Sequence, residues 1–125
     1  MNSIFLIAMA LFIFGCKTDP VAKPVPEIVI HTPADIQHFV MGDTIHITGT
    51  VTNIIALTAV AVHMTDLSSN IEFFHNHFAA GNSNIFHFDS KYPIPDYNKS
   101  SFRLEVEGTD KDGNIGSKEI LILIN

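Results

Sequence analysis

Three histidines with strand-like spacing are the residues of this sequence best suited to chemistry. His75 and His77 are two residues apart, so on a β-strand their side chains would share a face, with Cα atoms about 6.6 Å apart. His63 lies in the preceding apolar segment and could face them across a hairpin. Neutral imidazoles bind Zn²⁺ or Cu²⁺, and three of them leave a fourth coordination position open. The spacing therefore predicts a transition-metal site.

Further ligands for this site are available nearby in the sequence. The candidates that could complete it are His87, Asp89 and Glu72. The alternative interpretation is that the histidines are ordinary polar residues on the outward face of a sheet. A chain with seven histidines among 125 residues can contain a His-x-His pair by chance. Both interpretations stay open at this point.

A second candidate site lies near the C-terminus. Asp110, Asp112 and Asn114 have the alternating spacing of oxygen ligands at the start of a calcium-binding loop. The same residues surround Gly113, and Gly and Asn accept the positive φ of a tight turn at little cost. A plain hairpin turn is the interpretation we favour, and calcium binding is the alternative.

Other kinds of function have little support. The net charge is −6 and the seven Lys and Arg residues are scattered, which argues against a nucleic-acid surface. No Gly-x-Ser-x-Gly motif occurs, and Glu105 and Glu107 are expected to face solvent on a strand. We therefore expect a protein that is not an enzyme. A hydrolytic zinc ion with Glu72 as base is the remaining enzymatic alternative.

The elements that must position these residues are β-strands. From residue 27 onward apolar and polar residues alternate, turn residues recur, and no window has helical periodicity. The alternation predicts strands at Glu27–Ile30, Thr44–Thr52, Thr58–Thr65, Ile71–Phe78, Ile85–Asp89, Ser101–Thr109 and Ser117–Ile124. About seven short antiparallel strands without a helix indicate an all-β, immunoglobulin-like β-sandwich. We expect its core to include Val60, Val62, Phe102, Leu104 and Val106.

The N-terminus has the features of an exported protein. Residues 4–14 are apolar without interruption, too short for the roughly 20 residues that cross a bilayer but suited to a signal peptide. The following Gly15-Cys16 resembles the bacterial lipoprotein processing box, and Cys16 is the only cysteine. That resemblance implies cleavage before Cys16 and attachment of acyl chains to it, which would anchor the protein in a membrane.

Three segments follow from this interpretation. Residues 1–15 are a signal peptide, residues 16–26 a tether with three prolines, and residues 27–125 the single domain. The charged start of the tether, Lys17-Thr18-Asp19, resembles the signal that sends some Bacteroidetes lipoproteins to the cell surface. We expect an outer-membrane or cell-surface location in a Gram-negative bacterium.

The order of these motifs resembles one family. A lipoprotein leader, a Val62-His63 strand, the His75-Asn76-His77 pair and the Asp110–Asn114 turn occur in the order found in a Bacteroidetes lipoprotein family of unknown function. The resemblance spans almost the whole mature chain. It implies one immunoglobulin-like domain in the cell envelope, in a family with no settled activity. From the histidines themselves we expect a non-catalytic binding role with a metal ion, and the alternative is a protein- or glycan-binding module in which the histidines are incidental.

Overall fold

The computed structural model describes residues 23–96 and 100–125, and all the regular structure in them is β. Six strands follow one another along the chain. Their bounds are β1 Glu27–Thr32, β2 Gln37–Phe39, β3 Thr44–Asp66, β4 Glu72–Pro93, β5 Phe102–Asp110 and β6 Ile115–Ile124. None of these described residues lies in a helix that could cross a membrane. The predicted all-β class is confirmed.

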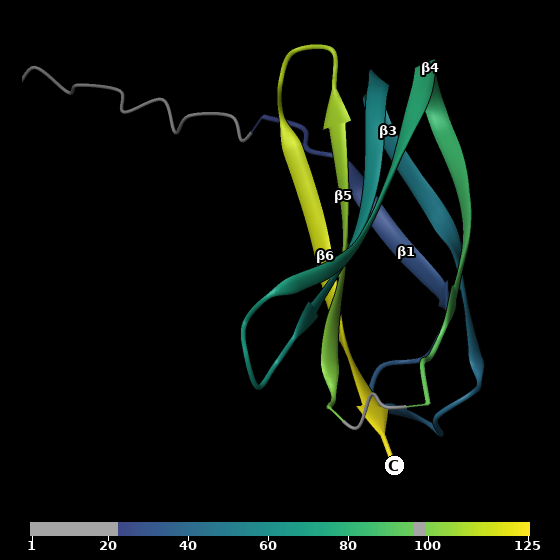
Figure 1. The fold of residues 1–125 in the computed structure, drawn as a ribbon. Coiled ribbons are helices and arrows are strands. Elements are labelled where there is room, and N and C mark those ends of the chain that lie inside the picture. Colours follow the sequence, from purple (N-terminus) through teal and green to yellow (C-terminus); the bar gives the residue numbers. More distant parts are fainter. Residues whose placement is uncertain (1–22, 97–99) are drawn as a thin grey trace, which may run out of the picture.

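The six strands belong to one mixed sheet. The strand order is β1-β3-β5-β6-β2, and β4 pairs with β3 beside this path. The short β2 runs parallel to β6, and the other neighbours are antiparallel. Figure 1 shows how the sheet curls, with the long β3 and β4 bending together from one side of the molecule to the other. The result resembles a half-barrel, and the two separate sheets of the expected sandwich are not present as such.

The bend divides the sheet into two arms. In the first arm, residues 44–52 of β3 pair with β1 and with residues 85–93 of β4. In the second arm, residues 57–66 of β3 pair with residues 72–83 of β4 and with β5. Register shifts between Thr52 and Ala59 mark the bend.

This continuity corrects the predicted strand boundaries. The strands expected at Thr44–Thr52 and Thr58–Thr65 are two halves of β3, and those expected at Ile71–Phe78 and Ile85–Asp89 are two halves of β4. At the bend the alternation of apolar and polar residues is interrupted. In the sequence this interruption has the appearance of a turn between two strands. Hydrogen bonding between β3 and β4 nevertheless resumes beyond it. These two mergers reduce the seven expected strands to five, and the short β2, which was not predicted, makes six.

The core lies inside the curl and matches the predicted one. The five residues expected there have no exposed surface: Val60, Val62, Phe102, Leu104 and Val106. Ile45, Ile47 and Phe88 of the first arm belong to the same cluster. Because both arms contribute to one core, alternate residues of the second arm must face outward, and these include His63.

The predicted signal peptide and Cys16 lie outside the described residues, as does most of the tether.

Candidate metal centre

The hairpin of β3 and β4 brings two of the predicted histidines together. His63 and His75 are direct partners in the antiparallel register of these strands. Side chains of directly opposed residues on one face have Cβ atoms about 4.5–5.5 Å apart, close enough to interact. Val62 and Met64, the neighbours of His63, point into the core and are fully buried. Packing of these neighbours therefore fixes the outward direction of the His63 side chain.

Three potential ligand atoms converge on this outward face. His63 Nδ1 lies 2.6 Å from Glu72 Oε1 and 3.0 Å from His75 Nδ1, and His75 Nδ1 lies 3.2 Å from the same Glu72 oxygen. Within residues 23–96 and 100–125, these three form the one group of His, Cys, Asp or Glu ligand atoms that all lie within 4.8 Å of one another. The expected site therefore exists as a group of two histidines and one glutamate.

The dimensions of this triangle suit a small metal ion. A triangle with these sides has a circumscribed radius of about 1.7 Å, shorter than the roughly 2.0–2.1 Å of a zinc–nitrogen or zinc–oxygen bond. Without any movement of the three atoms, a point at bond distance from all of them therefore exists about 1.1 Å from their plane. In a tetrahedral site the ligands are about 3.3 Å apart. The His63–Glu72 side, at 2.6 Å, would have to lengthen by about 0.7 Å to reach that geometry, and the other two sides by about 0.3 Å or less.

Glu72 reaches the site through an irregularity in strand pairing. It precedes His75 by three residues, so on a regular strand the two side chains would point to opposite faces. The register between β3 and β4 shifts between Met64 and Thr65, and Glu72 is the partner of Thr65. A shift of this kind reverses the alternation and re-aims a side chain. The ring of the next residue, Phe73, packs edge-on against buried Phe102.

The electrostatics of the group favour an ionised glutamate. Hydrogen bonds from His63 and then from His75 hold the pKa of the Glu72 carboxyl below its usual value. The other ring nitrogen of His63, Nε2, lies 3.6 Å from Oε2 of Glu107 on β5. The side chains of Glu72 and His75 are about half exposed, at 46% and 50%, whereas that of His63 is 19% exposed. The group thus contains an ionised carboxylate, is open to solvent on one side and is held by a more buried histidine on the other.

The other two predicted histidine ligands lie elsewhere. The His77 ring lies parallel to that of His75 with ring centres 6.4 Å apart, and His77 is not part of the converging group. His87 belongs to the first arm, where its Nδ1 lies 3.3 Å from Thr50 Oγ1. His31 Nε2 lies 3.2 Å from the same hydroxyl. His87 is separated from the site because the bend carries the second half of β4 into the first arm.

The turn from Asp110 to Asn114 has its own set of contacts. Asp110 is 2% exposed and its Oδ1 accepts hydrogen bonds from the backbone N–H groups of Asp112 and Asn114. Its Oδ2 accepts from the side-chain amides of Asn53 and Asn114. Both carboxylate oxygens thus serve the turn and join it to β3, as the hairpin-turn interpretation requires. Asp112 is exposed and is not drawn into a ligand group with Asp110.

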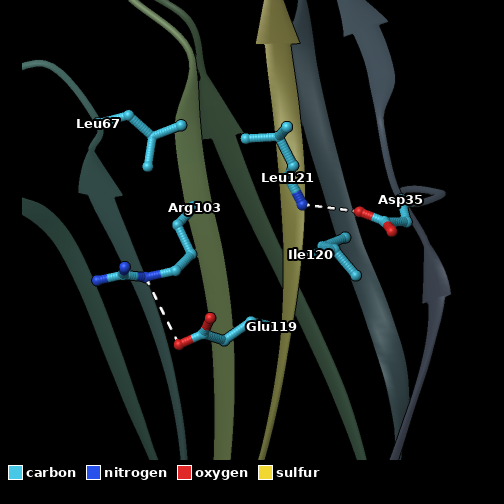
Figure 2. A pocket seen from close by; sticks show the side chains of 6 residues that line it. All are labelled: Asp35, Leu67, Arg103, Glu119, Ile120 and Leu121. Atoms are coloured by element: carbon cyan, nitrogen blue, oxygen red, sulfur yellow. Dashed lines mark hydrogen bonds and ion pairs between the residues drawn. The ribbon is translucent and has the colours of Figure 1, made fainter.

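An open hollow of about 220 Å³ lies on the same arm as the metal group. Arg103, Leu67 and Leu121 are among its lining residues, and the dashed line in Figure 2 joins the Arg103 side chain to Glu119. Arg103 Nε lies 3.7 Å from Glu119 Oε1, and the Leu121 N–H donates to Asp35 Oδ1. The hollow contains no group of metal-ligating atoms, so the chemistry of this arm is concentrated at His63.

Comparison with known proteins gives no independent guide to this site. No model of a known protein family matches the chain, and a search of curated proteins found no match. The resemblance to the Bacteroidetes lipoprotein family therefore stays a prediction.

Proposed function

We propose that this domain binds a divalent transition-metal ion, Zn²⁺ or Cu²⁺, in a non-catalytic role. The observation that carries the proposal is the convergence of His63 Nδ1, His75 Nδ1 and Glu72 Oε1 within 3.2 Å of one another. Two ring nitrogens and a carboxylate oxygen at such distances need protons or a cation between them. Imidazole and carboxylate are ligands that both metals accept, and a three-residue set leaves a position for water or for a further ligand.

The exposure of the group supports binding without catalysis. Hydrolytic metal sites place the ion in a shaped cavity that restricts water. Here two of the three ligand side chains are about half exposed on the face of a sheet. Such a position suits capture, storage or transfer of an ion.

We propose further that the domain is an immunoglobulin-like module held at the cell envelope by a lipid on Cys16. Two arms that enclose one core support the first part of this proposal, although they belong to one continuous sheet. The Gly15-Cys16 pair after an apolar segment supports the second. An outer-membrane or cell-surface location would expose the His63 face to metal ions outside the cytoplasm.

The test of the metal proposal is direct. The purified chain is stripped with a chelator, dialysed, and titrated with Zn²⁺ and with Cu²⁺, and bound metal is measured by elemental mass spectrometry. We expect one ion per chain, released on acidification because the imidazoles must lose protons to bind. A variant with His63, Glu72 and His75 all replaced by Ala should bind none. Equal metal content in this variant and the wild type would contradict the proposal.

A second candidate function, recognition of a protein or glycan without metal, is favoured by the hollow beside Arg103. It presents a cation together with the half-exposed Leu67 and the partly buried Leu121. Under this alternative the wild type would bind no metal, and Arg103→Ala would abolish partner binding while His63→Ala would not.

A further inference from the structure

His63 has a second ring nitrogen whose surroundings are unusual. Nε2 is shielded from solvent and has no hydrogen-bond partner in the part of the chain that the structure describes. A buried polar nitrogen without a partner costs free energy, so such atoms are rare and usually have a role. The nearest carboxylate oxygen given by the structure, Glu107 Oε2, lies 3.6 Å away, beyond hydrogen-bond distance.

The position of Glu107 follows from the register of two strands, β3 and β5. Glu107 is the β5 partner of Ala61, and Glu105 is the β5 partner of His63. Glu107 is therefore a diagonal neighbour of His63 on the outward face, at a separation that a long side chain can span. Its side chain is 39% exposed, which leaves it free to move by the small distance that a hydrogen bond requires.

Metal binding would determine which nitrogen of His63 carries a proton. Without metal, Nδ1 lies 2.6 Å from the Glu72 carboxylate, which can only accept, so Nδ1 is the donor. A metal ion bound to Nδ1 replaces the proton on that nitrogen. The one proton of the neutral ring must then be on Nε2. A buried Nε2–H needs an acceptor, and Glu107 Oε2 is the acceptor at hand.

We infer that Glu107 is a positioning residue of the metal site, which accepts a hydrogen bond from His63 Nε2–H when a metal ion is bound at Nδ1. This inference rests on the proposed function. A carboxylate behind a metal-bound histidine fixes the ring orientation and its tautomer and makes the ring a stronger ligand. Glu107 thus acts on the ion through His63 and does not touch it.

Glu105 provides a matched control. It lies on the same strand and the same outward face, two residues away, and carries the same charge. Among the described residues it makes no hydrogen bond or ion pair with the His63 ring. Removal of Glu105 therefore reports the general effect of one carboxylate near the site, and removal of Glu107 reports that effect together with loss of the acceptor.

The experiment compares zinc affinities of the full chain by competition with a chromophoric chelator. Glu107→Ala should weaken binding about 10–100-fold, the usual cost of losing such a partner, and Glu107→Gln, which keeps an acceptor of the same shape, should weaken it less. Glu105→Ala should change it by about fivefold or less, as expected for one partly exposed charge without a direct contact to the site. Thermal unfolding without metal checks that each variant is folded. Because Glu107→Gln has the same shape as the wild type, it remains usable if Glu107→Ala does not fold.

A spectroscopic measurement distinguishes the effect of Glu107 on the orientation and tautomer of the His63 ring from the effect of its charge. Nitrogen-15 NMR of the zinc-loaded wild type should show His63 bound through Nδ1, with a slowly exchanging proton on Nε2. In Glu107→Ala this proton should exchange faster, and in Glu105→Ala it should not. Equal affinity losses for the two Ala variants, or zinc bound through His63 Nε2, would overturn the inference while leaving the metal site intact. A wild type that binds no zinc would overturn the proposed function and this inference together.

Discussion

His63 and His75 are direct partners on β3 and β4, and their Nδ1 atoms lie 3.0 Å apart. This relationship distinguishes the two members of the His75-Asn76-His77 pair, although both point to the outward face. His77 is the partner of Ala61, whose side chain offers no ligand atom. The convergence of ligands is therefore specific to one of the two histidines.

The first prediction uses this difference. His75→Ala should weaken zinc binding by more than the roughly 10–100-fold expected for an outer partner, because it removes a direct ligand. His77→Ala, on the same strand and face, should leave the affinity within a few-fold of the wild type. Calorimetric titration of both variants provides the comparison. A larger loss for His77→Ala than for His75→Ala would mean that the ion lies elsewhere on this face.

Alternation in the sequence was sufficient to find the histidines but not the carboxylate. It placed Val60 and Val62 in the core, and His63, which then faces outward, was expected across a hairpin from His75 and His77. Glu72 was named only as one of three ligands that could complete the site. Simple alternation puts it on the face opposite His75, and the register shift beside it has no clear signature in the sequence.

The arrangement of the two halves of β3 and β4 in space also could not be predicted from local sequence patterns. His87 is exposed, but the bend places it in the first arm, away from the site it was expected to complete. Continuity of β3 across residues 53–56 depends on pairing with β4 on both sides of the bend. Such pairing joins residues far apart in the sequence, and a pattern read over ten residues does not contain it.

The second prediction concerns the Glu72 carboxylate. Glu72→Gln keeps the shape of the side chain but removes the charge, so zinc binding should weaken strongly while the fold is unchanged. Glu27→Gln on β1 is the matched control, since it removes another exposed carboxylate, one that lies outside the second arm. Chelator competition measures both. Binding by Glu72→Gln as tight as that of Glu27→Gln would show that Glu72 is not a ligand.

The third prediction tests the core. Leu104 is fully buried between the arms, so Leu104→Ala should lower the free energy of unfolding by about 2–5 kcal/mol. Leu67, which is 47% exposed, provides the control, and Leu67→Ala should change stability by about 0.5 kcal/mol or less. Urea unfolding of the two variants and the wild type gives the values. Similar losses for the two leucines would be inconsistent with a core centred between the arms.

The fourth prediction concerns the anchor. Cys16→Ala removes the only thiol that could carry acyl chains, so a labelled fatty acid should be incorporated into the wild type and not into the variant. The variant should also leave the membrane fraction. Cys16→Ser serves as a second variant of nearly the same size as cysteine. The lipoprotein interpretation would fail if wild type and variants fractionate alike and none of them carries label.

The last prediction is the pH dependence that Asp110 gives to stability. Burial of Asp110 opposes its ionisation, but hydrogen bonds from Asn114, from the backbone of Asp112 and from Asn53 outweigh burial and lower the pKa of the carboxyl below its usual 3.8. Because the pKa in the folded state is below that of the unfolded chain, the carboxylate stabilises the fold at neutral pH. This stabilisation decreases as the pH falls through the unfolded pKa and is lost below the folded one.

Asp110→Asn should therefore lower Tm at pH 7, and the difference from wild type should shrink as the pH falls from about 5 to about 2. Asp112→Asn is the control, since Asp112 is exposed and its change should have little effect at any pH. Melting curves by circular dichroism across this range measure both effects.

Calcium adds a test of the alternative site, because an ion that binds only the folded chain raises Tm. The hairpin-turn interpretation predicts an unchanged Tm with added calcium, since N–H donors already occupy both Asp110 oxygens.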